Sequence, residues 1–172
     1  MSADFQQIWS SREQIQTVQL QRLQELLQTI IPRNRFWTQR FKDAGIAAKD
    51  ITSLDDLRKI PLCTKQDIVA DQMAQSPYGS NLTFPSTKYR RLHQTSGTTG
   101  RPVRWMDTAE SWDWFMLCWR QIYTLAGLQE WDRLFFPFSF GPFIGFWAAF
   151  EGALRYGNFC IAGGGMSTTV RL

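Results

Sequence analysis

The chain has 172 residues, 44% of them apolar and 20% charged, and a formal net charge of +4. This length fits one domain with a small helical addition, and the composition is that of a globular protein, which argues against intrinsic disorder. The modest positive charge suits an anionic ligand and a nucleic-acid surface equally. The three cysteines stand far apart without a CxxC pair, which argues against a disulfide framework or a structural zinc site, and we assign no residue to a metal.

Two segments bear on where the protein resides. The first residues, MSADFQQIWSSREQ, lack the basic region and apolar core of a signal peptide. The apolar segment Leu134–Phe150 has the length of a minimal membrane span, but it contains Pro137, Gly141, Pro142 and Gly145. We therefore interpret it as a buried strand, turn and helix. Together these features predict a cytoplasmic protein without a membrane partner.

Residues 1–80 are predicted to form an N-terminal helical region. Ser10 and Glu13 make an S-x-x-E capping box that opens the first helix, which Pro32 ends. Three shorter helices follow, opened by Asn34, by Ser53 with Asp56, and by Thr64 with Asp67. We interpret the acidic residues of this region as helix caps rather than as acid–base groups, and we find no candidate catalytic cluster in it.

Residues 81–172 are predicted to begin an α/β domain that is incomplete. A strand over 88–93 and a returning strand over 103–106 make a β-hairpin. Asp107 and Glu110 are predicted to cap the next helix, which carries a Trp-rich apolar stripe. We interpret that stripe as core packing rather than as the lining of a cofactor pocket.

The last part of the chain reads as a βαβ unit. Buried strands are predicted over 134–136 and 159–162, with a helix between them that starts near Gly141. Such a unit implies a parallel sheet, and ligands bind beyond the carboxyl ends of parallel strands. The segments 139–141 and 163–165 lie at that edge, so we expect them to lie close together.

The predicted tip of the hairpin is the segment Thr95–Pro102, TSGTTGRP. Its glycines permit positive φ and close backbone approach to a ligand, and exposed N–H groups beside hydroxyls hold phosphate oxygens. It is not a P-loop, because Arg101 and Pro102 stand where that signature has Lys and Ser or Thr. Composition alone fits a polar hairpin loop equally well, and the position between two strands favours a phosphate-binding loop.

The flanks of the loop are basic, and the only histidine, His93, lies two residues before Thr95. We interpret His93 as a strand residue oriented by hydrogen bonds, since no serine–histidine–aspartate or metal spacing surrounds it. The basic side chains serve a nucleoside triphosphate or single-stranded nucleic acid equally well. They are Lys88, Arg90, Arg91, Arg101 and Arg104, interleaved with Tyr89 and Trp105.

The loop together with its flanks resembles one protein family. TSGTTGRP is similar to the phosphate-binding signature of the adenylate-forming superfamily, whose usual form has Lys where Arg101 stands. Four further segments resemble its phenylacetate–CoA ligase-like branch, namely 34–45, 53–57, 61–65 and 91–93. The resemblance extends from about Pro32 to Gly165 and identifies the chain as similar to the N-terminal portion of such a ligase.

The resemblance implies ATP-dependent activation of a carboxylic acid, aryl or otherwise apolar, as an acyl-adenylate, followed by thioester formation with coenzyme A. It implies Mg2+ with the ATP and a small-molecule carboxylic acid as partner. It implies no nucleic acid and leaves a homodimer open. It assigns ATP phosphate binding to Thr95, Ser96, Gly97, Thr98, Thr99, Gly100 and Arg101. It offers as acyl-pocket residues His93, Phe138, Phe140 and Gly141.

The resemblance places the catalytic lysine beyond this chain, so we assign no catalytic residue. We expect the 172-residue chain to be inactive alone, and carboxylate-dependent ATP–pyrophosphate exchange by it would contradict this. Two other interpretations stay open at this point. One is a non-catalytic module that binds a nucleotide or single-stranded nucleic acid through the basic hairpin, and the other is a degenerate product with an incomplete core.

Overall fold

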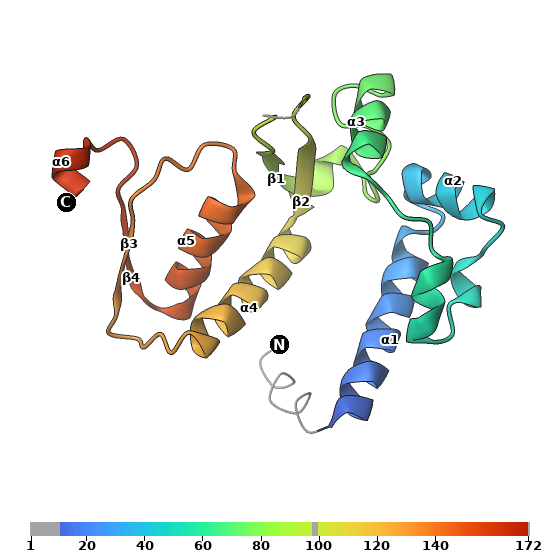
Figure 1. The fold of residues 1–172 in the computed structure, drawn as a ribbon, viewed down its shortest axis with the longest axis horizontal. Helices are drawn as coiled ribbons and strands as arrows, with labels where there is room; N and C mark the ends of the chain where they lie inside the picture. Colours follow the sequence, from blue (N-terminus) through green and yellow to red (C-terminus); the bar gives the residue numbers. More distant parts are fainter. Residues whose placement is uncertain (1–10, 98–99, 172) are drawn as a thin grey trace. The chain divides into compact units, whose positions relative to one another are not determined.

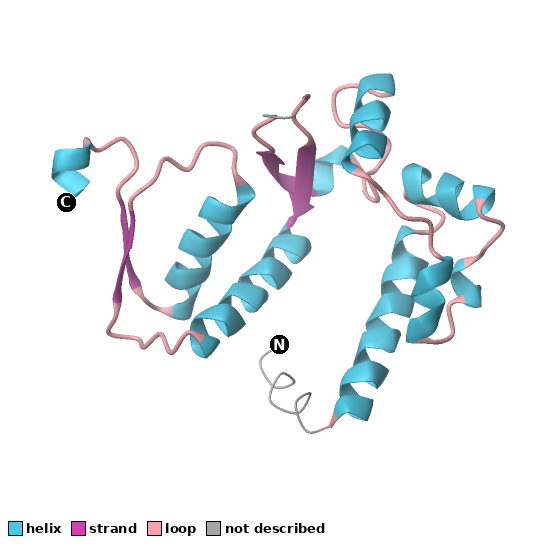
Figure 2. Cartoon of the chain, in the orientation of Figure 1, coloured by secondary structure: helices cyan, strands magenta, loops and turns pink. Residues whose placement is uncertain are grey.

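The computed structural model describes residues 11–97 and 100–171. The chain divides into two compact units, Met1–Pro85 and Ser86–Leu172 (Figure 1). Helices make up the first unit, and the second combines helices with short strands (Figure 2). The predicted α/β class, a helical layer followed by a hairpin and a βαβ unit, is confirmed.

The first unit is a group of helices whose starts are fixed by side-chain caps. Its elements are α1 (Arg12–Ile30), α2 (Arg35–Asp43), η2 (Ala48–Asp50), η3 (Leu54–Lys59) and α3 (Lys65–Ala74). The side chains of Ser11, Asn34 and Thr64 accept N–H bonds from the first turns of α1, α2 and α3. The cap of α1 is thus Ser11, whereas the predicted cap, Ser10, lies outside the described residues. The buried core of this unit contains Leu27, Phe41 and Ile51.

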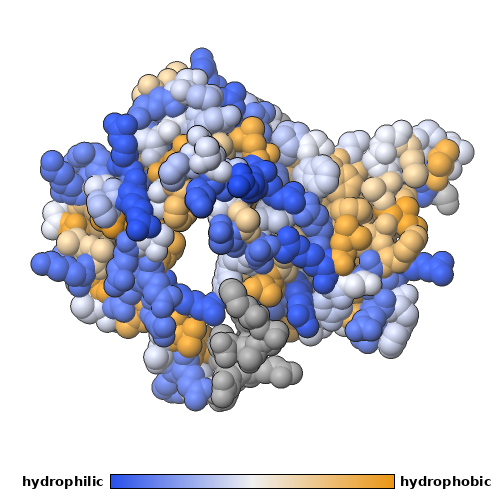
Figure 3. Space-filling view, turned by 180° about the vertical axis from the view of Figure 1, so that it is seen from behind, coloured by the Kyte–Doolittle hydropathy of each residue, from blue (hydrophilic) through white to orange (hydrophobic). Residues whose placement is uncertain are grey.

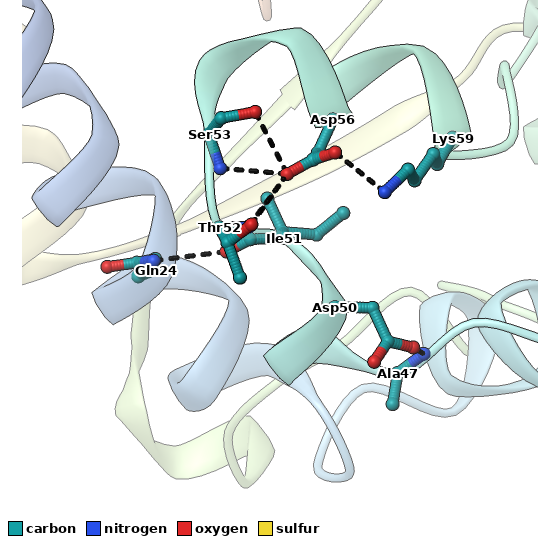
Figure 4. Close-up of polar contacts among 8 residues, drawn as sticks. All are labelled: Gln24, Ala47, Asp50, Ile51, Thr52, Ser53, Asp56 and Lys59. Carbon is teal, nitrogen blue, oxygen red and sulfur yellow. Dashed lines mark hydrogen bonds and ion pairs between the residues drawn. The ribbon is translucent and has the colours of Figure 1, made fainter.

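One buried carboxylate, Asp56, organises the turn that opens η3 (Figure 4). Its Oδ2 accepts the backbone N–H groups of Thr52 and Ser53 at 2.9 and 2.8 Å, and its Oδ1 lies 2.7 Å from Lys59 Nζ. The hydrogen bond from Lys59, followed by those from the two N–H groups, holds the pKa of Asp56 well below its usual range. Gln24 Nε2 donates to the backbone carbonyl before Thr52 at 3.0 Å and so ties the turn to α1.

The second unit combines an antiparallel hairpin with a parallel strand pair. Its elements are η4 (Ser86–Lys88), β1 (Tyr89–Gln94), β2 (Arg104–Thr108), α4 (Ala109–Leu125), β3 (Arg133–Phe136), α5 (Ile144–Tyr156), β4 (Phe159–Ala162) and α6 (Thr168–Arg171). β1 pairs antiparallel with β2, and β3 pairs parallel with β4 through the crossover helix α5. Both the predicted hairpin and the predicted βαβ unit are therefore confirmed.

Two predicted helix starts in this unit are wrong. α4 is capped by Thr108, whose side chain accepts from Ser111 N at 3.2 Å, whereas Asp107 belongs to β2. Thr108 therefore takes the role that the sequence pattern assigned to Asp107. α5 begins at Ile144 instead of near Gly141, because Gly141 has φ of 50° and forms part of a turn before the helix.

Helices α4 and α5 lie side by side, with α5 between α4 and the β3–β4 pair (Figure 1). Gly152 of α5 allows the close approach, since a Cβ there would lie 2.6 Å from Trp119 Cβ of α4. Tyr123 of α4 donates its hydroxyl to Ala149 O at 2.7 Å, and burial raises the pKa of Tyr123 to about 12, which keeps it a donor. The buried residues of this interface are Trp112, Met116 and Ala148.

The parallel strand pair carries apolar side chains at the surface, at the right of Figure 3. Phe135 is 41% exposed and Phe159 is 64% exposed, and Ile161 is also exposed. The prediction of two buried strands is therefore wrong for most of their residues. A sheet of two strands has too few neighbours to cover its faces, whereas parallel sheets are ordinarily covered on both. In the described part of the chain, no helix is both long enough and apolar enough to cross a membrane.

The close approach of α4 and α5 predicts opposite effects for two glycines of the same helix. Gly152→Ala places a methyl group against Trp119 Cβ of α4, so we expect the free energy of unfolding to fall by about 1–3 kcal/mol. Gly145→Ala meets no atom within 4 Å, so stability should be unchanged or higher by up to about 1 kcal/mol. Urea denaturation of both variants tests this, and equal effects would contradict it.

Asp56 should make the stability of the chain depend on pH. Because its folded-state pKa lies below that of an unfolded aspartate, about 3.9, its contribution is complete above about pH 5 and is lost as the pH falls further. We expect Asp56→Asn to lower the urea midpoint at pH 7 and to have a much smaller effect at pH 3. The exposed neighbour Asp55, as Asp55→Asn, is the control, and a pH-independent effect of Asp56→Asn would contradict the interpretation.

Candidate functional site

Two hydrogen bonds between Thr95 and Val103, one between backbone groups and one to a side chain, close the base of the hairpin loop. Thr95 N donates to Val103 O at 3.0 Å, and Thr95 Oγ1 accepts from Val103 N at 2.9 Å. Val103 is buried, at 2% exposure, so these bonds anchor the base of the loop to a residue of the core. Thr95 Oγ1 therefore accepts one hydrogen bond at the base of the loop.

Beyond that base the loop is exposed. Ser96, Gly100 and Arg101 are all exposed, as a site for an entering ligand requires. The predicted phosphate-binding residues Thr98 and Thr99 lie outside the described residues. The structure thus places five of the seven predicted loop residues, and these five stand together at the tip of the hairpin.

Gly97 occupies a position that only glycine fits. Its φ is 71°, in the left-handed region, and a Cβ there would lie 2.9 Å from Gly100 O and 3.1 Å from Pro102 Cδ. Gly100 N donates to Gly97 O at 2.9 Å, which tightens the turn. Gly100 also has positive φ, at 142°. The backbone is therefore tightly curved at Gly97 and at Gly100, and this curvature fits the approach of phosphate oxygens to N–H groups.

His93 lies on hairpin strand β1, and its side chain is buried inside the second unit. It is 4% exposed and its ring stacks on the indole of Trp112, with centroids 5.0 Å apart and an interplanar angle of 20°. Its Nδ1 lies 3.4 Å from Asp107 Oδ2 of the neighbouring strand. In this structure His93 packs as a strand residue in the core. A role in the acyl pocket stays a prediction.

One acidic residue, Glu151, joins the helices to the hairpin. Its two oxygens lie 2.7 Å from the two terminal nitrogens of Arg91, and Oε2 also accepts from Trp112 Nε1 at 2.9 Å. The Arg91 guanidinium lies over the Trp112 ring, 4.3 Å from its centroid. Arg91 is thus paired inside the unit, which corrects its assignment to the basic surface available to phosphates. The sequence signal for Glu151 was its position as the single acid in the apolar helix α5.

Two of the residues offered for the acyl pocket, Phe138 and Phe140, belong to an aromatic cluster between β3 and α5. Phe138 lies 4.2 Å from Phe146 between ring centroids, and Phe140 lies 4.9 Å from Trp147. Trp147 Nε1 donates to Gly141 O at 2.8 Å, which holds the turn against α5. All these contacts are with α5, so the half-buried rings of Phe138 and Phe140 pack against that helix as well as standing at the edge of the sheet.

The carboxyl ends of β3 and β4 meet as the sequence predicted. Gly163 N donates to Phe136 O at 2.9 Å. A Cβ on Gly163 would lie 2.7 Å from the ring of Phe135, and a Cβ on Gly164 would lie 3.1 Å from Phe138 O. The two glycine-containing segments are therefore in direct contact, and glycines are required where they touch.

A single backbone bond joins this edge to the hairpin loop. Gln94 N donates to Pro142 O at 2.8 Å. Gln94 precedes the first loop residue, Thr95, and Pro142 follows Gly141. The structure therefore brings the predicted phosphate-binding loop next to the predicted acyl-pocket segment, although the two are separated by about half of the second unit along the chain.

Known proteins with similar sequences share one name. The chain is 30% identical over 149 residues to the phenylacetate-coenzyme A ligase of Escherichia coli (strain K12), covering 86% of this chain and 33% of that protein. It is 33% identical over 140 residues to the protein of the same name from Pseudomonas putida, covering 81% and 30%. No protein-family model matches the chain.

Solved structures with the same fold are also acid–CoA ligases. A 2-hydroxyisobutyryl-CoA ligase in complex with 2-HIB-AMP and CoA, in the thioesterification state, superposes with a TM-score of 0.85 at 25% identity, covering 92% of this chain and 34% of that one. An open conformation of that ligase gives a TM-score of 0.84 at 23% identity. The chain spans about a third of the length of the relatives it matches. The predicted resemblance is confirmed, and it is consistent with an N-terminal portion.

The bond from Val103 to the side chain of Thr95 predicts a measurable contribution to stability. Thr95→Val keeps the shape but leaves the buried Val103 N–H without its acceptor, so unfolding free energy should fall by about 1–3 kcal/mol. Thr95→Ser keeps the oxygen and should cost less than about 0.5 kcal/mol. Urea denaturation compares the two, and an equal loss in both variants would contradict the role of the oxygen.

Proposed function

From the sequence similarity to phenylacetate–CoA ligases and the fold similarity to a 2-hydroxyisobutyryl-CoA ligase, we propose that the chain forms the phosphate-binding part of an enzyme that activates a carboxylic acid with ATP and transfers the acyl group to a thiol. The proposed reaction forms an acyl-adenylate and pyrophosphate, and coenzyme A then displaces AMP to give a thioester. The observation that carries the proposal is the loop around Gly97, whose curvature leaves no room for a Cβ beside exposed polar residues.

The loop residues have separate roles in this proposal. The backbone N–H group of Gly97 and the hydroxyl groups of Thr95 and Ser96 would bind phosphate oxygens, whereas the N–H group of Gly100 already donates to Gly97 O. Thr98 and Thr99 are assigned to the same role from the sequence. Arg101 is exposed and supplies positive charge, and its planar fork can bind two phosphate oxygens at once where a lysine would act as a point charge.

The acid is proposed to bind beside the loop, at the edge where β3 and β4 end. The backbone bond between Gln94 and Pro142 supports this placement, because it joins the loop to the Phe138–Gly141 segment. Phe138 and Phe140 are half-buried, so each presents part of its ring beyond the core. Aromatic surface favours an aryl or other apolar acid over a strongly polar one.

The remaining parts of the proposed reaction lie outside the described site. We expect Mg2+ to enter with the triphosphate. We also expect the lysine that completes adenylation to stand elsewhere in a longer protein, because the relatives are about three times the length of this chain. The exposed apolar surface of β3 and β4 supports the view that further segments cover this sheet. A cytoplasmic location and a homodimer stay predictions.

Binding of ATP to the chain tests the proposal directly. Calorimetric titration should show Mg·ATP binding that is competed by pyrophosphate and not by adenosine, because the proposed contacts are with phosphates. Gly97→Ala should weaken this affinity by about tenfold or more, since the methyl group displaces the loop backbone.

The matched control is Gly145→Ala, a glycine-to-alanine change that meets no neighbouring atom and should leave the affinity unchanged. Affinity for ATP that is insensitive to Gly97→Ala would contradict the proposed site. Salt-dependent binding of a single-stranded oligonucleotide in place of ATP would favour a nucleic-acid module instead.

A further inference from the structure

Glu151 carries a charge into the interior face of an apolar helix, where it needs compensation. Its side chain is 19% exposed, and its helix α5 contributes Ala148, Gly152 and Ala153 to the buried surface. A carboxylate in such a place is costly unless its oxygens are fully paired. Arg91 satisfies both oxygens with two short bonds, and Trp112 adds a third donor. The acid is therefore held in one orientation by groups from two other elements.

The partners of Glu151 form a layered stack. The Arg91 guanidinium covers one side of the Trp112 ring, and the His93 ring stacks on Trp112 as well. Arg91 and His93 both belong to β1, while Trp112 belongs to α4. The guanidinium of Arg91 and the rings of Trp112 and His93 thus hold β1 against α4. Glu151 fixes the orientation of Arg91 and Trp112. Removing the carboxylate would leave Arg91 as a half-buried cation without its counter-charge.

The strand held in this way leads directly into the loop. Thr95 follows Arg91 by four residues, and β1 continues without interruption to Gln94. At that end Gln94 N is bonded to Pro142 O, just before α5 begins. β1 is therefore held at two points, at Arg91 by the Glu151 side chain of α5 and at Gln94 by the backbone of the turn that precedes α5. Two fixed points set the direction in which the strand enters the loop.

We infer that Glu151 is a positioning residue for the nucleotide site. It acts through Arg91 and Trp112 to fix the direction in which β1 leads into the loop that begins at Thr95. The inference rests on the proposed function for what the loop binds. Glu151 itself does not touch the loop in the described structure. Its effect on ligand affinity is therefore indirect. Replacing Glu151 should weaken ligand binding while leaving the hydrogen-exchange protection of α4 and α5 unchanged.

The test uses Glu151→Gln, which keeps the size of the side chain and removes the charge. Calorimetric affinity for Mg·ATP should fall by about tenfold in the folded variant. Hydrogen exchange of the nucleotide-free protein should speed up at Gln94 and Val103 while the amides of α4 and α5 keep their protection. Arg91→Lys serves as a second variant, because it keeps the positive charge but loses the planar fork, and it should also weaken binding.

Asp113→Asn is the matched control. Asp113 of α4 pairs with Arg155 of α5, so this change removes an acidic partner between the same two helices without touching β1. Both residues are exposed, and affinity should change by less than about twofold.

An unchanged ATP affinity in folded Glu151→Gln, or a loss of protection spread evenly over the second unit, overturns the inference and leaves the ion pair a stability feature. If the wild-type chain binds no ATP, the proposed function fails together with the nucleotide role of Glu151. The exchange comparison then still decides whether Glu151 positions the hairpin, because it needs no nucleotide.

Discussion

The second unit depends on the close contact between α4 and α5 at Gly152. Because this glycine has no side chain, α5 approaches Trp119 closely enough that the preceding residue, Glu151, reaches the hairpin. A larger residue at 152 would push the helix away and lengthen every contact that Glu151 makes. The packing of two helices thus determines the position of a polar pair, and that pair holds the strand that carries the candidate site. Gly152 therefore sets the helix packing, and the adjacent Glu151 connects that packing to the candidate site.

Features governed by local chemistry could be predicted from the sequence. The caps at Asn34, Ser53 and Thr64, the hairpin, and the parallel strand pair follow from capping preferences, turn residues and apolar runs that act within a few positions. The contact between the segments after β3 and β4 followed from a general property of parallel sheets. The family resemblance came from a loop whose residue types are constrained by its geometry.

Features governed by tertiary contact could not be predicted. Arg91 looked like one member of a basic surface, and only the fold shows that an acid 60 residues away turns it inward. Phe135 and Phe159 looked like core residues because an apolar run gives no information about how many neighbours a strand will have. His93 does lie on a strand, but its interpretation as a residue oriented by hydrogen bonds was wrong for Nδ1, which has no hydrogen-bond partner among the described residues. Its ring stacks instead on Trp112, on a helix that the local pattern could not orient.

Protection of backbone amides upon ligand addition tests the central claim, that the loop 95–101 is a phosphate-binding site, most directly. Hydrogen exchange of the wild-type chain would be measured with and without Mg·ATP, and followed along the sequence. The account predicts slower exchange in the segment from Gln94 to Val103, with little change in the first unit. Protection that is absent from this segment, or that appears along the helices of the first unit instead, would contradict it.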